Sequence, residues 1–366
     1  MKAKIVYAIA FACLVVILIM PMITHNAIVQ TIEASSDMRI HLAVITGQQA
    51  ETSYFGQTII RTLLSEFDNV SQAYLWFNFI ALIGVAGTMF YVTRELISRE
   101  ASYFVIPFAL FGATGILALF QYGVIFNIIN MYIVLPFAVL FTIRWLTGGK
   151  LYNAGIGLVL FALFSVGHYT ALYLPYFIYV AVGGYIIYAI VKKKAFTLKK
   201  VIPYGGVALG LNLFLSKMFL RPSNELICME VNDSFVAGTD VGMVIKNGIQ
   251  TLPIVFQHIS LVLIPIVIAL VIWVIRKRNN LEISQSTKIL LCMIAGAVIA
   301  LGGGLFLHII SIYSRLVIDM TTLTAVLLAG LVGIFLKYRQ SKFMTGLVTC
   351  LAVVVSAPNV ITWVRW

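Results

Sequence analysis

The chain has 366 residues, of which 61% are hydrophobic and 10% are charged, and its mean hydropathy is +1.02. This small number of polar side chains cannot cover the surface of a water-soluble globule of this length. The composition therefore excludes a soluble protein and indicates a chain whose main solvent is lipid. The formal net charge of +12 does not indicate a nucleic-acid-binding protein, because the basic residues follow a membrane topology and form no single patch.

Continuous apolar runs predict an all-α integral membrane protein with about eleven transmembrane helices. Each span takes roughly 20 apolar residues, so residues 1–366 form one transmembrane domain with no separate soluble domain. The first run follows Met-Lys-Ala-Lys and lacks a small-residue cleavage site, so we expect a helix that is retained in the membrane. In chain order the predicted helices are 5–24, 73–92, 102–120, 128–146, 153–167, 170–190, 201–219, 251–275, 288–310, 316–336 and 343–362.

The charges between these helices alternate from one connection to the next. With a cytoplasmic N-terminus, the inner segments hold 18 of the 25 basic residues and only three of the 13 acidic ones. The inner side therefore has a net charge of +15 and the outer side of −3. This positive-inside bias predicts a multi-pass protein of the cell membrane with a cytoplasmic N-terminus and an extracytoplasmic C-terminus.

The two long connections, at about 25–72 and 220–250, both fall on the outer side of this topology. Long loops in a compact membrane domain are usually functional or disordered, and these two mix apolar and polar residues too evenly for disorder. The later part of the first loop is amphipathic and suits a helix that lies in the membrane interface, with an apolar set of Ile59, Ile60, Leu63, Leu64 and Phe67. The inner connections are short basic turns.

All five histidines map to the outer half of the predicted topology. They are His25, His41, His168, His258 and His308. One explanation is a polar, substrate-binding vestibule on that side. The alternative is that histidines gather at membrane interfaces because they are amphipathic.

The segment Ser35-Ser36-Asp37-Met38-Arg39-Ile40-His41 follows the first predicted span. In a helix, Asp37 and His41 stand at i and i+4 and share one face. A carboxylate there can accept a proton from an attacking hydroxyl group, while His41 tunes its pKa or binds substrate. The structural alternative is that Ser-Ser-Asp is an ordinary N-cap.

An aspartate and a histidine four residues later, directly after the first helix, resemble the first external loop of the GT-C superfamily of polytopic glycosyltransferases. Further stretches are similar in their pattern of helices and of residues that interrupt helices: TRELISREASYFVIPFALF, GVIFNIINMYIVLPFAVLF, GHYTALYLPYFI and SIYSRLVIDMTTLTAVLLAGLVGIFL. The likeness covers most of the chain, but only the aspartate-containing loop is a specific motif. It implies a GT-C-like fold and sugar transfer from a polyprenyl-phosphate donor at the outer membrane face.

The resemblance also implies roles for individual residues. Asp37 matches the catalytic aspartate that deprotonates the acceptor, and His41 matches a polar residue one helical turn later. Arg315 is the best candidate for binding the donor phosphate, because a guanidinium group pairs with phosphate oxygens in a fork. The alternative for Arg315 is an ion pair with Asp319. The other candidate residues for binding substrate or phosphate are Arg39, His168 and His308, with Arg61, Lys217 and Arg221 as weaker candidates.

Two departures from the family pattern limit these roles. Many relatives carry a second acidic group after the third helix, where this chain reads Gln-Tyr-Gly-Val-Ile-Phe-Asn over 121–127. No cofactor is therefore assigned, and a divalent metal has no second acidic ligand to support it. The chain also stops just after its last predicted helix, so we expect the acceptor to be held by the membrane domain, the long loops or a protein partner of the cell envelope.

The sequence thus predicts an inverting glycosyltransferase that moves a sugar from a polyprenyl-phosphate donor to a glycan or lipid-linked acceptor, among membrane lipids and without nucleic acid. Three alternatives stay open: a carrier or flippase for lipid-linked saccharides, a polymerase that joins them, and a non-catalytic scaffold. Carriers usually place charges at mid-depth in paired broken helices related by a repeat. The predicted spans have few such charges and no repeat. The sugar, the acceptor and the oligomeric state are not encoded in any recognisable motif.

Overall fold

A computed structural model of the protein describes residues 2–24, 63–64, 66–112, 129–167, 195–219, 246, 249, 263–306 and 313–365. Each element defined within them is helical. In chain order these are α1 (Lys2–Thr24), α5 (Val70–Leu96), α6 (Arg99–Val105), η1 (Ile106–Phe111), η2 (Asn130–Val134), α9 (Leu135–Leu146), α10 (Leu151–Gly167), α12 (Ala195–Phe219), α15 (Leu263–Lys277), α16 (Gln285–Phe306), α17 (Tyr313–Arg339) and α18 (Lys342–Arg365). Each predicted helix coincides wholly or in part with one of these elements, except 170–190, which lies outside the described residues.

Three helices start three residues earlier than predicted because a polar cap precedes the apolar run. The side chain of Asn69 accepts a hydrogen bond from the amide of Gln72 at 3.0 Å, and α5 begins at Val70. The hydroxyl of Ser98 accepts from the amide of Ala101 at 3.1 Å at the start of α6. Ser284 caps α16 in the same way. The first, polar turn of each helix is therefore fixed by a side chain that satisfies a free backbone amide.

Three helices of the described part are long and apolar enough to cross a membrane, by length and composition: the stretches Phe79–Leu96, Met320–Arg339 and Lys342–Ile361. Shorter apolar helices cover Ile9–Met20, Tyr132–Leu146, Leu151–Ser165 and Gln285–Ala300. Large apolar side chains also lie exposed on the outside of the bundle, among them Ile299 at 74% and Phe343 at 77%. An all-helical protein with such surfaces is a membrane protein.

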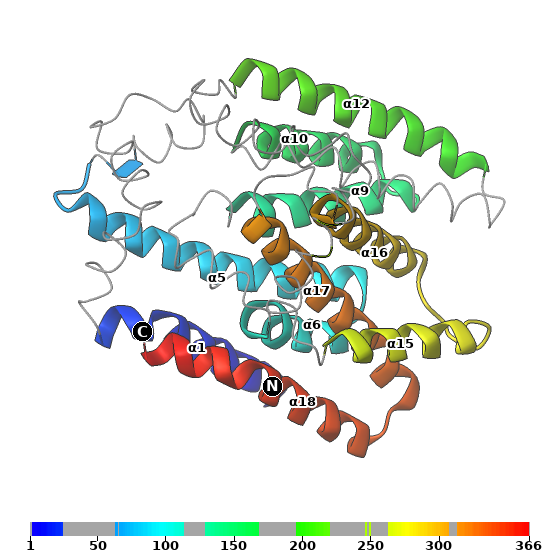
Figure 1. Ribbon diagram of the computed structural model, residues 1–366. Coiled ribbons are helices and arrows are strands. Elements are labelled where there is room, and N and C mark those ends of the chain that lie inside the picture. Colours follow the sequence, from blue (N-terminus) through cyan, green and yellow to red (C-terminus); the bar gives the residue numbers. More distant parts are fainter. Residues whose placement is uncertain are drawn as a thin grey trace.

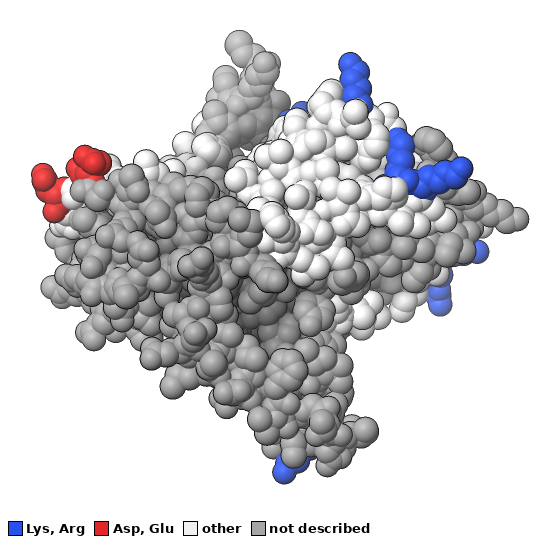
Figure 2. Space-filling model, turned by 90° about the horizontal axis from the view of Figure 1, so that it is seen from above, with Lys and Arg blue, Asp and Glu red and all other residues white. Residues whose placement is uncertain are grey.

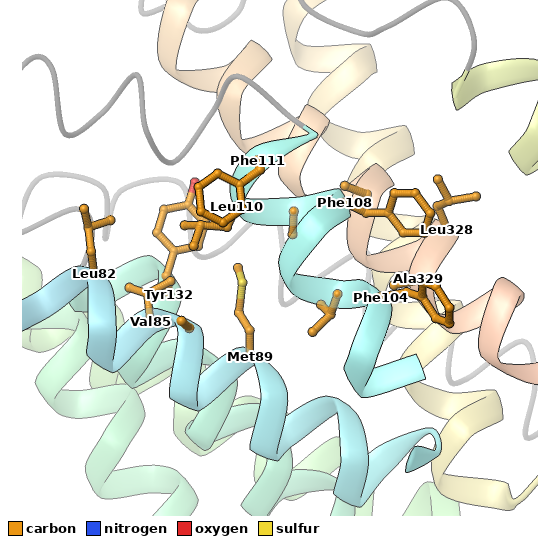
Figure 3. Packing of buried hydrophobic residues seen from close by; sticks show 14 of the residues in the cluster. Leu82, Val85, Met89, Phe104, Phe108, Leu110, Phe111, Tyr132, Leu328 and Ala329 are labelled. Atoms are coloured by element: carbon orange, nitrogen blue, oxygen red, sulfur yellow. The ribbon is translucent and has the colours of Figure 1, made fainter. Parts of the chain in front are cut away.

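Helix α17 runs through the middle of the bundle, between α6, α15 and α16 (Figure 1). Phe104 of α6 and Phe108 of η1 pack toward Leu328 and Ala329 of α17 (Figure 3). On the other side of the α6–η1 helix, Leu110 and Phe111 lie with Tyr132 near the residues of α5 that line the core (Figure 3). The α6–η1 helix is therefore held between α5 and α17, and this contact forms the centre of the hydrophobic core.

Most of the helix ends that carry basic residues meet at one end of the bundle, which we call the basic end. Arg144 of α9 pairs with Glu95 of α5 at 2.6 Å, and Lys200 of α12 lies 4.2 Å from the ring centre of Trp145. The start of α16 is tied to the same place, because the hydroxyl of Thr287 donates to the carbonyl of Leu96 at 2.7 Å. Figure 2 shows most of the basic side chains of one face toward one end and the acidic ones at the opposite end.

The other end of the bundle holds the opposite helix termini. Val70 begins α5 there, next to the exposed Glu66 and Asp68, and α17 begins there at Tyr313. Helices α1 and α18 contact each other and run in the same direction, so that Thr24 also lies toward this end (Figure 1). The predicted long loops follow Thr24 and Phe219, and residues 25–62 and 220–245 of these loops lie outside the described residues.

Only the end of the first predicted loop is described, and it is partly amphipathic. Leu64 is 3% exposed and belongs to the core, whereas Leu63 and Phe67 are more than half exposed. The predicted positions Ile59 and Ile60 lie outside the described residues.

Candidate functional site

Most residues predicted to carry chemistry lie outside the part of the chain that the structure describes. These are Asp37, Arg39, His41, His168 and His308. Arg315 falls in the first turn of α17, and only the backbone is described at this position. The site is therefore examined through the elements that flank these residues.

Helix α17 carries Arg315 at the end of the bundle opposite to the basic end. Arg315 precedes the last residue of the helix, Arg339, by 24 positions. At 1.5 Å per residue the two positions are about 36 Å apart, close to the thickness of a bilayer with part of its headgroup regions. The helix thus connects a basic position on one face of the bundle with the basic end on the other.

Three threonines follow Arg315 along α17 and are buried in the bundle: Thr321, Thr322 and Thr324. The hydroxyl of Thr324 donates to the carbonyl of Met320 at 2.7 Å. The hydroxyl oxygen of Thr322 has no hydrogen-bond partner, although the residue is only 2% exposed. These polar side chains place a hydroxyl-rich stretch in the half of the central helix nearer to Arg315. Their sequence signal is the interruption of an apolar run by Thr-Thr-Leu-Thr at 321–324, which sequence reasoning missed.

Next to this stretch, the short helix formed by α6 and η1 runs from Arg99 to Phe111. Its last six residues form a π-helix that contains Pro107, a residue without a backbone amide hydrogen. The side chain of Asn359 in α18 donates a hydrogen bond to the carbonyl of Phe111. A Cβ atom on the following Gly112 would lie 2.8 Å from Val355 of α18, so α18 packs closely against this helix end. A free helix end inside an apolar bundle is thus satisfied by a side chain from another helix.

Two polar contacts hold α12 against α9 and α10. The hydroxyl groups of Thr142 and Tyr204 lie 2.8 Å apart, and Asn212 donates to Ser165 at 2.8 Å. Gly157 leaves room for the Tyr204 hydroxyl, because a Cβ atom at this position would overlap it. Pairs of this kind fix the register of helices that otherwise slide on apolar surfaces.

The ion pair at the basic end was missed by sequence reasoning. Arg144 and Glu95 are each about one-third exposed, at 36% and 37%, so water screens their attraction and the pair contributes under about 1 kcal/mol. Its main effect is to join the ends of α5 and α9. The sequence signal is an acid among the basic residues of an inner segment that also holds Glu100, but the partner is 49 positions away.

Metal binding was examined within the same ranges. Among the described residues no group of three or more His, Cys, Asp or Glu side chains lies close enough together to hold a metal ion. Asp37 and all five histidines fall outside these ranges, so the finding concerns the helical bundle alone.

Comparisons of this chain with protein-family models, with curated proteins and with solved structures find no match.

Proposed function

We propose that this chain is an inverting glycosyltransferase of the cell membrane. It transfers a sugar from a polyprenyl-phosphate donor to a glycan or lipid-linked acceptor at the extracytoplasmic face. The observation that carries this proposal is the pair Asp37 and His41 in the segment that follows the first helix, together with its resemblance to the GT-C superfamily. The N-terminus is then cytoplasmic, and the basic end of the bundle faces the cytoplasm.

The arrangement of the helix ends supports this topology. Thr24, after which the chain continues toward Asp37, and Tyr313, two residues before Arg315, both lie away from the basic end. A phosphate-binding arginine and a catalytic carboxylate must lie on the same side of the membrane to act on one donor. The positions of these two helix ends meet that requirement.

The course of α10 and α12 supports a count of eleven spans. Tyr204 of α12 lies against Gly157 of α10, and Asn212 of α12 lies against Ser165 of α10, so residue numbers increase in the same direction along both helices. Two consecutive helices of the described part thus run parallel, which is the arrangement that a span between them requires. The predicted helix 170–190 supplies that span.

The proposed reaction is a single displacement at the anomeric carbon. An acceptor hydroxyl oxygen attacks this carbon as the bond to the phosphate oxygen breaks, so the configuration inverts and polyprenyl phosphate leaves with the bonding electrons. Asp37 accepts the hydroxyl proton, and His41 binds substrate or tunes the pKa of the carboxyl group. Arg315 binds the phosphate as negative charge develops on it. The lipid tail occupies apolar surface between helices.

Transfer from a labelled polyprenyl-phosphate sugar pool tests this proposal in membranes that contain equal amounts of inserted protein. We expect Asp37→Asn to lower transfer by at least about 100-fold, within the usual contribution of a general base, while donor binding is retained. Asp68→Asn is the matched control, because Asp68 is an exposed acid of the same predicted loop. Unchanged transfer in Asp37→Asn removes this residue from the chemistry.

A carrier for lipid-linked saccharides is the second candidate function. The observation that favours it is the pair of π-helical segments inside the bundle: η1, which contains Pro107, and η2, which ends two residues before Pro136. Broken helices of this kind often surround substrate sites in carriers. In the transfer experiment, a carrier gives no labelled product with wild-type protein but moves the labelled lipid between leaflets.

A further inference from the structure

Trp273 of α15 lies near the basic end and packs against two aromatic side chains of α17. Its ring stands edge-on to Phe335 at a centroid distance of 5.1 Å and to Tyr338 at 5.4 Å. The indole nitrogen Nε1 is shielded and has no hydrogen-bond partner. A shielded donor without an acceptor is costly, so each such atom calls for an explanation.

Four basic residues stand close in sequence to the residues of this aromatic contact. Arg276 and Lys277 end α15, and Lys337 and Arg339 lie in the last turn of α17. All four are exposed, and within the described ranges no ion pair joins any of them to a carboxylate. An indole N–H and several unpaired cations share one preference, which is for negatively charged oxygen atoms. A phosphate group supplies such atoms in a compact form.

An exposed apolar stripe on another side of α15, about a third of a turn around the helix from Trp273, indicates that this phosphate belongs to a lipid. Ile268, Ile272 and Ile275 are exposed by 53%, 46% and 61%, and their spacing places them on one side of α15. This apolar stripe leads directly to Arg276 at the basic end. An acyl chain can lie along the stripe while its headgroup reaches the cations, whereas a free phosphate ion makes no use of it.

We propose that the crossing of α15 and α17 at the basic end binds the headgroup of an anionic phospholipid. The N–H group of Trp273 donates to a phosphate or ester oxygen, and the four basic residues compensate the negative charge. The N–H group is shielded and Trp273 is only partly buried as a whole residue, so binding requires the side chain to rotate toward the ligand. The site is independent of the proposed sugar transfer and lies at the opposite end of α17 from Arg315.

Binding of phosphatidylglycerol to the purified full-length protein in detergent tests this inference, with phosphatidylcholine as the neutral probe. Native mass spectrometry measures the affinity for each lipid. We expect the wild-type protein to prefer phosphatidylglycerol and Trp273→Phe to weaken that binding about tenfold, because one hydrogen bond to a charged group is lost. Trp145→Phe is the matched control, since Trp145 is also an indole side chain at the basic end.

The double variant Lys337→Gln, Arg339→Gln provides a second test, because these exposed side chains can change without disturbing the fold. We expect it to weaken phosphatidylglycerol binding and to reduce the dependence of that binding on salt concentration. The inference is overturned by equal binding of the two lipids, by wild-type affinity in both Trp273→Phe and the double variant, or by displacement of the lipid by an equal concentration of inorganic phosphate.

Discussion

At the scale of single residues, Gly333 allows α17 to approach α6. A Cβ atom at this position would lie 2.5 Å from the Cβ atom and 2.7 Å from the Cα atom of Ala101. The nearest atoms belong to the backbone or are bonded to it, so no flexible side chain can give way. The substitution Gly333→Ala must therefore push the two helices apart.

We expect Gly333→Ala to lower the free energy of unfolding by about 1–3 kcal/mol, the usual cost of overpacking a well-packed core. Thermal unfolding of the purified protein in detergent measures the effect. Gly346→Ala is the matched control, because a Cβ atom at Gly346 of α18 meets nothing within 4 Å. Equal stability of the two variants would mean that α6 and α17 are not in contact at Gly333.

The close approach at Gly333 could not be predicted from the sequence. A glycine in an apolar run is compatible with any helix surface, so the residue type does not reveal a close contact. Its partner Ala101 is more than 200 positions away in the chain. Only the pairing of α6 with α17 makes this glycine necessary. The same reason explains why the Arg144–Glu95 pair was missed, while the presence of both helices was predicted.

At the scale of the element, η1 depends on a hydrogen bond from another helix. Asn359 of α18 donates to the carbonyl of Phe111 at the end of η1. In Asn359→Leu this carbonyl loses its donor inside an apolar bundle. We expect the free energy of unfolding to fall by about 1–2 kcal/mol and the backbone amides of residues 106–112 to exchange faster. Hydrogen–deuterium exchange with mass spectrometry measures both local and global opening.

Ser356→Ala is the control for this prediction. The hydroxyl of Ser356 donates to Ala352 within α18 itself at 2.7 Å and does not reach η1. Its removal leaves the end of η1 satisfied, so exchange over 106–112 should match the wild type. Exchange over residues 106–112 that is as slow in Asn359→Leu as in the wild type would contradict the role given to Asn359.

The helices themselves were largely predictable because each apolar run is long and continuous. The first turns of α5, α6 and α16 were not predictable from hydrophobicity. They follow the polar caps Asn69, Ser98 and Ser284, and polar residues at such positions are typical of connections as well. The π-helical form of residues 106–111 was also missed. Pro107 was visible as a local signal, but a proline near a helix start is compatible with a regular helix as well. The choice between the two depends on packing against α5 and α17.

At the scale of the whole molecule, the charges separate along the bundle. The contacts of Arg144, Lys200 and Thr287 join the ends of four helices at the basic end. Charge alternation in the sequence predicts that such ends share one side of the membrane. The contacts bring these four ends together, and the side of the membrane on which they lie stays a prediction. The candidate catalytic residues could be proposed from the sequence alone, because a short motif around Asp37 needs no knowledge of packing. Their arrangement in space stays a prediction.

The proposed function depends first on which side of the membrane each end occupies, and cysteine accessibility in intact cells measures this directly. Single cysteines replace Ser35, Glu66 or Asn279 in a protein whose four native cysteines, at 13, 228, 292 and 350, are changed to alanine. Glu66 lies exposed before α5, and Asn279 lies in the exposed turn after α15.

We expect a membrane-impermeant maleimide to label Ser35→Cys and Glu66→Cys in intact cells, and to label Asn279→Cys only after the membrane is permeabilised. That result places the Asp37 segment on the extracytoplasmic face, where the proposed sugar transfer takes place. Labelling of Asn279→Cys in intact cells, with Ser35→Cys protected until permeabilisation, would contradict both the topology and the proposed site of sugar transfer.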